Sequence, residues 1–336
     1  MTRPTHSTSV PVIDISALRD CSNPSLVAAA IDAACRDTGF FCITGHGINP
    51  ALFDALDTAS RQFFALSAEA KAEIAMAVGG RAWRGWFPLG GEVTSGVPDR
   101  KEGIYFGQEL DERDPRVRAG RALHGRNLFP LQVPELTSLV LTWIEALTTL
   151  GHIVMSGIAL GLGLAPDWFR MELTSDPTVL FRIFQYPVDG PGEWGVAQHT
   201  DYGLLTLLAQ DDRGGLQVRS RSGWIDVDPI PNTFVCNIGD ILERMTGGRY
   251  RSTLHRVRNT SGRDRLSFPF FFDPSWDAHV HALPLAPETD MTQTDTSETS
   301  GGHRWDGTSV FDFSGTYGEY LIAKVSKVFP NLVRVI

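Results

Sequence analysis

The stretch from Thr178 to Phe272 decides the fold. It holds short runs rich in β-branched, aromatic and leucine residues: VLFRIFQY (179–186), LLTLLAQ (204–210), LQVRS (216–220), WIDV (224–227), TFVCNI (233–238) and RLSFPFFF (265–272). Between them, Gly214-Gly215 and Ser222-Gly223 are natural hairpin or loop positions. Closely spaced short strands of this kind predict a mainly β protein built on an antiparallel barrel or jelly roll.

Helices are expected to flank this core. Helical spacing of apolar residues predicts helices that begin at Asn23-Pro24 and that cover Ala51–Leu66, Glu135–Leu160 and Tyr317–Val328. The Glu135–Leu160 segment has one apolar face, which is typical of a packing helix. Short strands are expected at Val10–Ile15 and Gly39–Thr44. Residues 79–100, rich in Gly, Pro and Trp, predict a loop, and residues 286–309, rich in Thr, Ser, Gly and acids, predict a mobile surface loop.

The composition limits the classes of function. The 336 residues are 42% hydrophobic and 21% charged, as in an ordinary globular protein, and the net charge of −9 argues against general binding of nucleic acids or anionic membranes. No signal peptide or membrane span is evident. Cys21, Cys35, Cys42 and Cys236 form no CxxC pair, which favours reduced thiols in a cytoplasmic protein. We expect a monomer or weak homodimer.

A candidate metal site follows from three residues. In Gln198-His199-Thr200-Asp201, the histidine and the carboxylate are two positions apart, so on a strand they share a face. His255 lies far enough along the chain to return on another strand. Two imidazoles and one carboxylate leave three coordination positions open, as oxygen activation by non-haem iron(II) requires. Alone, an HxD pair with a distant His can arise by chance among nine histidines.

A candidate carboxylate anchor follows ten residues after His255. Arg265 and Ser267 share a strand face, and a guanidinium flanked by a hydroxyl is a good bidentate receptor for a carboxylate. Tyr186 could donate a hydroxyl to the same carboxylate. A metal triad with such an anchor indicates an iron that also binds a keto acid.

With these motifs in place, the chain resembles the isopenicillin N synthase-like family of 2-oxoglutarate/Fe(II)-dependent dioxygenases. The resemblance covers nearly the whole chain, through PVIDIS (11–16), GFFCITGHGI (39–48), FRIFQYP (181–187), QHTDYGLLTLLAQDD (198–212), GGLQV (214–218), NIGDILERMTGGRYRSTLHRV (237–257) and RLSFPFFFDP (265–274). It implies a double-stranded β-helix (jelly roll) core, with His199, Asp201 and His255 as iron ligands. It also implies that Arg265, Ser267 and Tyr186 bind the distal carboxylate of 2-oxoglutarate.

Two further features concern the substrate pocket. Many relatives have Asn two residues before the matching Tyr, where this chain has Phe184. GGEVTSGVPDR (90–100) followed by AGRALHGRN (119–127) resembles bacterial members of the family that include the ethylene-forming enzyme. The aromatic-basic cluster of Trp83, Arg84, Trp86 and Phe87 is interpreted either as loop packing or as one wall of the substrate pocket. Phe184 is a further candidate for that wall. The resemblance implies that walls come from residues 79–105 and 286–328.

The expected function is oxidation of a small organic substrate with formation of succinate and CO2 from 2-oxoglutarate and O2. Hydroxylation is the expected outcome, with desaturation or cyclisation as alternatives. A 2-oxoglutarate-independent iron oxidase of the same fold, an ethylene-forming enzyme and a non-catalytic binding protein stay open. We expect a single structural domain, divided into an N-terminal region (1–120), packing helices (121–177), the catalytic core (178–280) and a variable loop with a C-terminal helix (281–336).

Overall fold

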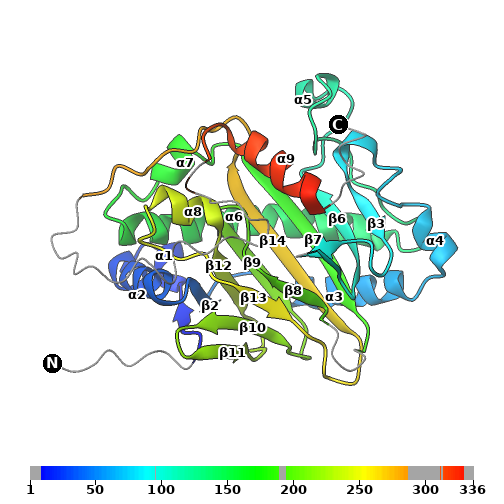
Figure 1. Cartoon of the computed structure of the whole chain (residues 1–336), viewed down its shortest axis with the longest axis horizontal. Coiled ribbons are helices and arrows are strands. Elements are labelled where there is room, and N and C mark those ends of the chain that lie inside the picture. The colour runs from blue at the N-terminus through cyan, green and yellow to red at the C-terminus, as the bar shows by residue number, and fades with distance from the viewer. Residues whose placement is uncertain (1–8, 95, 189–193, 287–310, 312, 329–336) are drawn as a thin grey trace.

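The computed structural model describes residues 9–94, 96–188, 194–286, 311 and 313–328. Two β-sheets face each other, and helices cover the outer side of the larger one (Figure 1). In spatial order the larger sheet contains β1 (Val12–Asp14), β2 (Phe40–Thr44), β12 (Phe234–Ile238), β9 (Leu205–Gln210), β14 (Arg265–Ser275), β7 (Pro177–Tyr186), β6 (Glu102–Gly107) and β3 (Gly85–Phe87). The smaller contains β11 (Gly223–Val227), β10 (Leu216–Ser220), β13 (His255–Val257) and β8 (Val196–His199).

The predicted antiparallel core is present. Each of the six runs that the sequence singled out forms a strand, and the pairs around β7, β9, β10 and β14 are antiparallel. Only β1 and β2 pair in parallel among the described strands. Because side chains alternate across a strand, one face of each sheet points to a shared cavity and the other to helices or solvent.

Helices surround the sheets. They are α1 (Ser16–Arg19), α2 (Pro24–Asp37), α3 (Pro50–Phe64), α4 (Ala68–Ala72), α5 (Pro115–Arg118), α6 (Glu135–Gly161), α7 (Trp168–Glu172), α8 (Asp240–Met245) and α9 (Tyr317–Val328). Proline at the first helical position begins α2 and α3, as its fixed φ favours. For α3, the side chain of Asn49 also accepts a hydrogen bond from Ala51 N.

The long helix α6 packs behind the larger sheet. It contacts α2, α3, β7, β9 and β14. It is the one described helix long and apolar enough to cross a membrane, and its packing between sheet and helices accounts for that composition. Gly151 allows the close approach, because a Cβ there would lie 2.5 Å from the Phe272 ring. The packing role predicted for this segment is therefore confirmed.

The prediction of a loop over residues 79–100 is wrong in part. Gly85–Phe87 forms the edge strand β3 on β6, and β4 (Val93–Thr94) pairs with β5 (Val97–Pro98) in a small hairpin. Gly85 adopts φ +119, and a Cβ there would lie 2.3 Å from Ile74 O. Tertiary pairing, which local Gly, Pro and Trp content cannot reveal, decides this segment.

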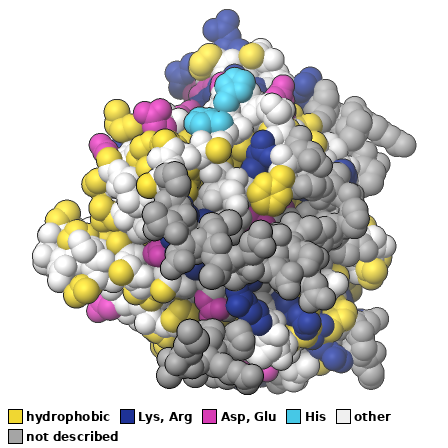
Figure 2. Space-filling model, turned by 60° about the vertical axis from the view of Figure 1, so that its left-hand side comes forward, with side chains coloured by type: hydrophobic (Ala, Val, Ile, Leu, Met, Phe, Trp, Pro, Cys, Tyr) yellow, Lys and Arg dark blue, Asp and Glu magenta, His cyan; other side chains and the backbone are white. Residues whose placement is uncertain are grey.

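Several other expectations have outcomes here. The C-terminal helix is confirmed, whereas residues 287–309 of the predicted mobile loop lie outside the described residues. Cys35, Cys42 and Cys236 are buried and unpaired, and Cys21 is exposed. The fourfold division of the chain stays a prediction, although its first part already supplies β1, β2, β3 and β6 to the larger sheet. On the face in Figure 2, basic and acidic side chains of the described residues are interspersed.

Candidate metal centre and co-substrate site

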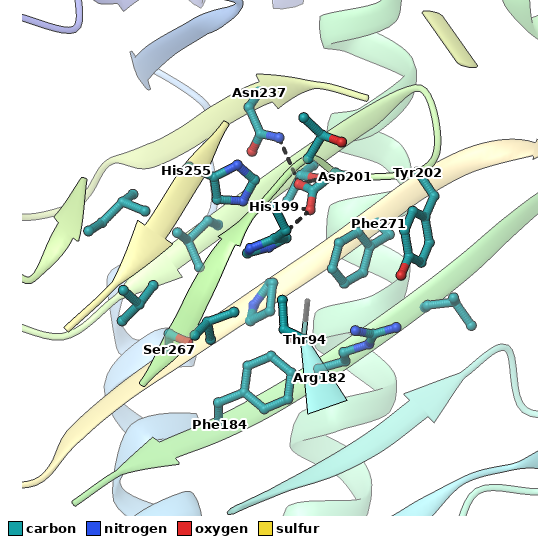
Figure 3. A pocket seen from close by; sticks show the side chains of 18 of the residues that line it. Thr94, Arg182, Phe184, His199, Asp201, Tyr202, Asn237, His255, Ser267 and Phe271 are labelled. Atoms are coloured by element: carbon teal, nitrogen blue, oxygen red, sulfur yellow. Dashed lines mark hydrogen bonds and ion pairs between the residues drawn. The ribbon is translucent and has the colours of Figure 1, made fainter. Parts of the chain in front are cut away.

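The structure brings His199, Asp201 and His255 together between the two sheets. His199 ends β8 and pairs in register with His255 at the start of β13, and Asp201 lies in the turn just after β8. One ligand atom from each residue lies within 4.8 Å of the others. Oδ1 of Asp201 is 3.8 Å from Nε2 of His199 and 3.7 Å from Nε2 of His255. Figure 3 shows the three side chains converging from these elements.

Backbone carbonyls orient both imidazoles. Nδ1 of His199 lies 2.9 Å from Ala197 O, and Nδ1 of His255 lies 3.1 Å from Thr253 O. A proton on each Nδ1 satisfies these carbonyls and leaves the Nε2 lone pairs directed at the shared space. Ring orientation and tautomer are thus set by the local backbone.

Asp201 is held by two side chains that the sequence analysis did not assign to the site. Its Oδ2 accepts hydrogen bonds from the Thr206 hydroxyl (2.6 Å) and from the Asn237 amide (2.7 Å). Oδ1 is therefore left to face the two imidazoles. The sequence signal for Asn237 is an amide inside an otherwise apolar strand, β12, because buried polar groups need partners.

The electrostatics of the triad suit a cation. Burial, followed by the neighbouring His255, lowers the pKa of His199 to about 3, so its imidazole is neutral at pH 7. Burial alone would raise the pKa of Asp201, but His255 and His199 outweigh it and the pKa lies below its usual value. Two imidazoles and one carboxylate, with open space beside them, are the donor set of non-haem iron(II) oxygenases.

Arg265 is the second component of the site. It lies on β14 directly across from Tyr186 on β7, and its side chain is fully buried. Its Nη2 donates to Gln210 Oε1 at 3.1 Å, while its Nε and Nη1 have no protein partner. Tyr186 lies 4.9 Å from the guanidinium, and its hydroxyl accepts a 3.4 Å hydrogen bond from Ser267. Unpaired buried N–H groups of a cation call for an anionic ligand.

One cavity joins these groups. Its walls include the triad, Arg265, Ser267 and Tyr186, and also Phe184. Gly103 on β6 makes room for Phe184, because a Cβ there would lie 2.6 Å from that ring. Phe184 thus lies where a substrate or co-substrate would contact it.

The other three residues predicted to form the substrate wall do not line this cavity. Arg84 is buried and directs its guanidinium at the carbonyls of Gln108, Leu123 and Gly125. Trp86 donates through Nε1 to Glu102 at 2.8 Å. Phe87 packs behind Phe184, with ring centroids 6.2 Å apart. The alternative interpretation of this cluster, loop packing, is the one that the contacts support.

Charged residues form this part of the cavity wall instead of Arg84, Trp86 and Phe87. Lys101 contacts Glu92 at 2.9 Å and Asp99 at 2.7 Å, and Arg182 lies 3.7 Å from Glu92. All four line the cavity or support residues that do. The sequence held one signal, because Arg182 shares its strand face with Phe184 and Tyr186. Glu92, Asp99 and Lys101 belong to the 79–105 segment expected to contribute walls.

The C-terminal helix α9 forms part of the cavity wall. Leu321 and Val328 of α9 line it. Tyr317, at the start of α9, donates a 2.6 Å hydrogen bond to Asp273 of β14, whose other oxygen accepts one from Leu204 N at 2.9 Å. Burial is the main cause that raises the pKa of Asp273 to about 7. The hydrogen bond from Tyr317 to this buried carboxyl is one of the contacts that hold α9 against β14.

Three other histidines, His46, His279 and His281, lie outside this site. His279 and His281 are exposed, and Nδ1 of His281 lies 3.0 Å from His279 O. His46 is buried, and its Nδ1 accepts from Ile48 N at 3.1 Å while Nε2 faces Asn232 O at 3.1 Å. Within the described part of the chain, His199, Asp201 and His255 are the one group of three or more potential metal ligands.

A jelly roll with a His-Asp-His cluster and a buried arginine in one cavity defines an oxygenase class, and comparisons with known proteins agree. Residues 10–132 match the family described as "non-haem dioxygenase in morphine synthesis N-terminal", and residues 175–274 match the "2OG-Fe(II) oxygenase superfamily". A probable iron/ascorbate oxidoreductase of Dictyostelium discoideum is 44% identical, covering 96% of this chain and 95% of its own. A homoarginine-6-hydroxylase of Glycine max is 37% identical, covering 98% and 99%.

Solved structures support the same assignment. A Neurospora crassa enzyme crystallised with α-ketoglutarate and thymine superposes with a TM-score of 0.78 at 26% identity, covering 97% of this chain and 99% of that one. A 2OG-Fe(II) oxygenase family protein of Caulobacter crescentus gives 0.77 at 27% identity, covering 96% and 100%. The chain belongs to the 2OG-Fe(II) oxygenase superfamily. The predicted family, jelly-roll fold, enzyme class and cofactors (iron(II) and 2-oxoglutarate, with O2) are confirmed.

Proposed function

We propose that His199, Asp201 and His255 hold the iron(II) and that Arg265 binds the distal carboxylate of 2-oxoglutarate, with Ser267 and Tyr186 beside it. The observation that carries this assignment is the pair of buried Arg265 N–H groups without a protein partner, in the same cavity as the triad. A guanidinium matches a carboxylate bidentately. When bound, the iron supplies activation of O2 coupled to oxidation of 2-oxoglutarate.

The proposed reaction converts a C–H bond of a small molecule, 2-oxoglutarate and O2 into C–OH, succinate and CO2. One oxygen atom enters the product and the other enters succinate. The chain contributes binding and orientation, because Asn237 and Thr206 fix Asp201 while α9 and the β4–β5 hairpin restrict access of water. Desaturation or cyclisation would need the same site with a different substrate geometry.

We further propose that the substrate is a small amino acid. Two kinds of relatives are named for such molecules: the homoarginine-6-hydroxylase and a 1-aminocyclopropane-1-carboxylate oxidase of Dictyostelium discoideum, which is 38% identical and covers 96% of this chain. The mixed-charge wall of the cavity supports this class. We also propose a monomer or weak homodimer that works in the reducing cytoplasm; the free cysteines support the compartment.

The test follows succinate formation under air with iron(II), with and without 2-oxoglutarate, across a panel of L-amino acids. We expect succinate that depends on 2-oxoglutarate and rises with one panel member, accompanied by an oxidised product. Oxidation of a panel member without added 2-oxoglutarate and without succinate would contradict the proposal. Ethylene in the headspace in place of a substrate-derived product would show the alternative, ethylene-forming reaction. His199→Ala provides the inactive control.

A further inference from the structure

A pair of opposite charges, Arg182 and Glu92, lies on the cavity wall. We propose that Arg182 binds the carboxylate of the substrate and that Glu92 binds its ammonium group, so that the pair selects α-amino acids. This inference rests on the proposed function, since it assumes that the same cavity holds the iron and 2-oxoglutarate. It adds the residues that recognise the substrate and separates them from those that recognise the co-substrate.

Strand geometry places Arg182 away from the co-substrate anchor. Along β7, Arg182, Phe184 and Tyr186 alternate with buried residues and all face the cavity. Tyr186 is directly across from Arg265, and Arg182 lies four residues back, or about 13 Å along the strand. A five-carbon diacid held at Arg265 is shorter than that spacing. Figure 3 shows Ser267 and Arg182 toward opposite ends of the wall, with the triad between them.

The guanidinium of Arg182 has donors to offer. It lies between two rings, 4.2 Å from the Tyr105 centroid and 4.8 Å from that of Phe271. Its Nε is buried without a hydrogen-bond partner, and its contact with Glu92, at 3.7 Å, is longer than a hydrogen bond. Contacts with the two rings restrain the group, and its Nε keeps an N–H for a ligand. A planar carboxylate can accept two parallel hydrogen bonds from the edge of a guanidinium.

Glu92 supplies the negative partner. Its Oε1 accepts a 2.7 Å hydrogen bond from Tyr105, and Lys101 lies 2.9 Å from Oε2. Each carboxylate oxygen can accept more than one hydrogen bond, so acceptor capacity remains for an ammonium. Burial would raise the pKa of Glu92, but Lys101 and Arg182 outweigh it and keep the group ionised.

Lys101, the other cation of the wall, is already neutralised. Its ammonium contacts Asp99 at 2.7 Å and Glu92 at 2.9 Å, and it lies 4.5 Å from the Phe184 ring centroid. Thr94 also donates to Asp99, which fixes that carboxylate in the β4–β5 hairpin. Lys101 therefore positions Glu92, whereas Arg182 keeps free donors. The separation of the substrate-binding charges, 3.7 Å, suits the adjacent ammonium and carboxylate of one α-carbon.

Calorimetry on the protein loaded with Mn(II), as a redox-inert stand-in for iron, and 2-oxoglutarate tests the pair. A panel of L-amino acids that includes homoarginine serves as the probe set, and the tightest binder is compared with its carboxamide and its deaminated acid. Arg182→Gln removes the charge-assisted contact, so it should lower the affinity for that amino acid about 30-fold or more. It should not change 2-oxoglutarate affinity. Glu92→Gln should lower the affinity for the amino acid but not the affinity for its deaminated acid.

Arg265→Gln is the reciprocal control, because it should lower the affinity for 2-oxoglutarate and leave the affinity for the amino acid unchanged. If Arg182→Gln weakens 2-oxoglutarate instead, Arg182 binds the co-substrate and the inference is overturned. It is equally overturned if no amino acid binds the wild type, or if the carboxamide binds as well as the acid. If Arg265→Gln leaves 2-oxoglutarate affinity unchanged while the other variants behave as expected, the proposed function is contradicted and this inference is not. Should Arg182→Gln not fold, Arg182→Lys, which keeps the charge but not the planar fork, should show a smaller loss.

Discussion

The side-chain amide of Asn237 donates a 2.7 Å hydrogen bond to Oδ2 of Asp201, and the Thr206 hydroxyl donates a 2.6 Å bond to the same oxygen. Both donors come from strands of the larger sheet, whereas the two histidines stand on the smaller one. The carboxylate of Asp201 is therefore fixed from one side and presented to the imidazoles from the other. Its rotamer is set before any ion binds.

Removal of this support should weaken metal binding without removing a ligand. Asn237→Ala is expected to lower iron affinity about 10- to 100-fold, the range found when hydrogen bonds to metal ligands are lost. Thr206→Val should act in the same direction. Titration of the apoprotein with iron(II) under anaerobic conditions measures the effect. Thr233→Val is the matched control, since its exposed hydroxyl bonds to Ile230 O away from the site; equal affinities of Asn237→Ala and this control would refute the supporting role.

Loss of a ligand should have a larger consequence. In His199→Ala or His255→Ala, two remaining ligands cannot hold the ion in a facial arrangement, so we expect undetectable turnover and iron affinity weakened by more than about 100-fold. His281→Ala, altered at an exposed imidazole, should match the wild type in both measurements. Wild-type turnover in either triad variant would remove that residue from the proposed metal site.

The sequence indicated two parts of the site because each is a local pattern, whereas His255 lies outside both patterns in the chain. The two-residue spacings of His199 with Asp201 and of Arg265 with Ser267 imply shared strand faces, and the apolar runs around them fix which strands form. The structure places all four in one cavity. The register between β14 and β7 then pairs Arg265 with Tyr186. This is the position that Tyr186 needs in order to contact the same carboxylate as Arg265.

The residues that escaped prediction depend on partners distant in the chain. Tyr317 meets Asp273, and Asn237 meets Asp201, only through tertiary packing. Arg84 looked like a wall residue because its neighbours are aromatic, but the turn before β3 directs its guanidinium to backbone carbonyls. Composition indicates which side chains are available in a loop, and it does not indicate which side of an edge strand they occupy.

Asp273 should make stability depend on pH. Its pKa is about 7 in the fold, mainly through burial, against an ordinary value of 3.8. The folded state therefore binds more protons than the unfolded state between about pH 4 and 7, and this carboxyl lowers the unfolding free energy as pH rises through that window. Above pH 7, the ionised carboxyl of Asp273 lowers the unfolding free energy by at most about 4 kcal/mol. Asp273→Asn removes it.

Denaturant unfolding of the metal-free protein at pH 5 and pH 8 checks this expectation. The unfolding free energy of Asp273→Asn relative to wild type should increase from pH 5 to pH 8. Asp277→Asn, at an exposed position on the same segment, should show no such change. A difference between Asp273→Asn and wild type that stays constant with pH would contradict the raised pKa.

Arg265 offers the sharpest separation between an oxygenase that uses 2-oxoglutarate and an oxidase that does not. Its Nε and Nη1 are buried without protein partners. Arg265→Ala should therefore remove a desolvated, charge-assisted contact with the carboxylate of 2-oxoglutarate. The expected penalty of about 2–5 kcal/mol corresponds to roughly 30-fold to several-thousand-fold weaker 2-oxoglutarate affinity. Arg265→Lys should recover only part of it, because an ammonium cannot reproduce the planar fork. Iron affinity should hardly change, since no metal ligand is altered. The 2-oxoglutarate dependence of succinate formation, measured beside iron titration for both variants, decides the matter. An unchanged apparent constant for 2-oxoglutarate in Arg265→Ala would rule out this arginine as the anchor.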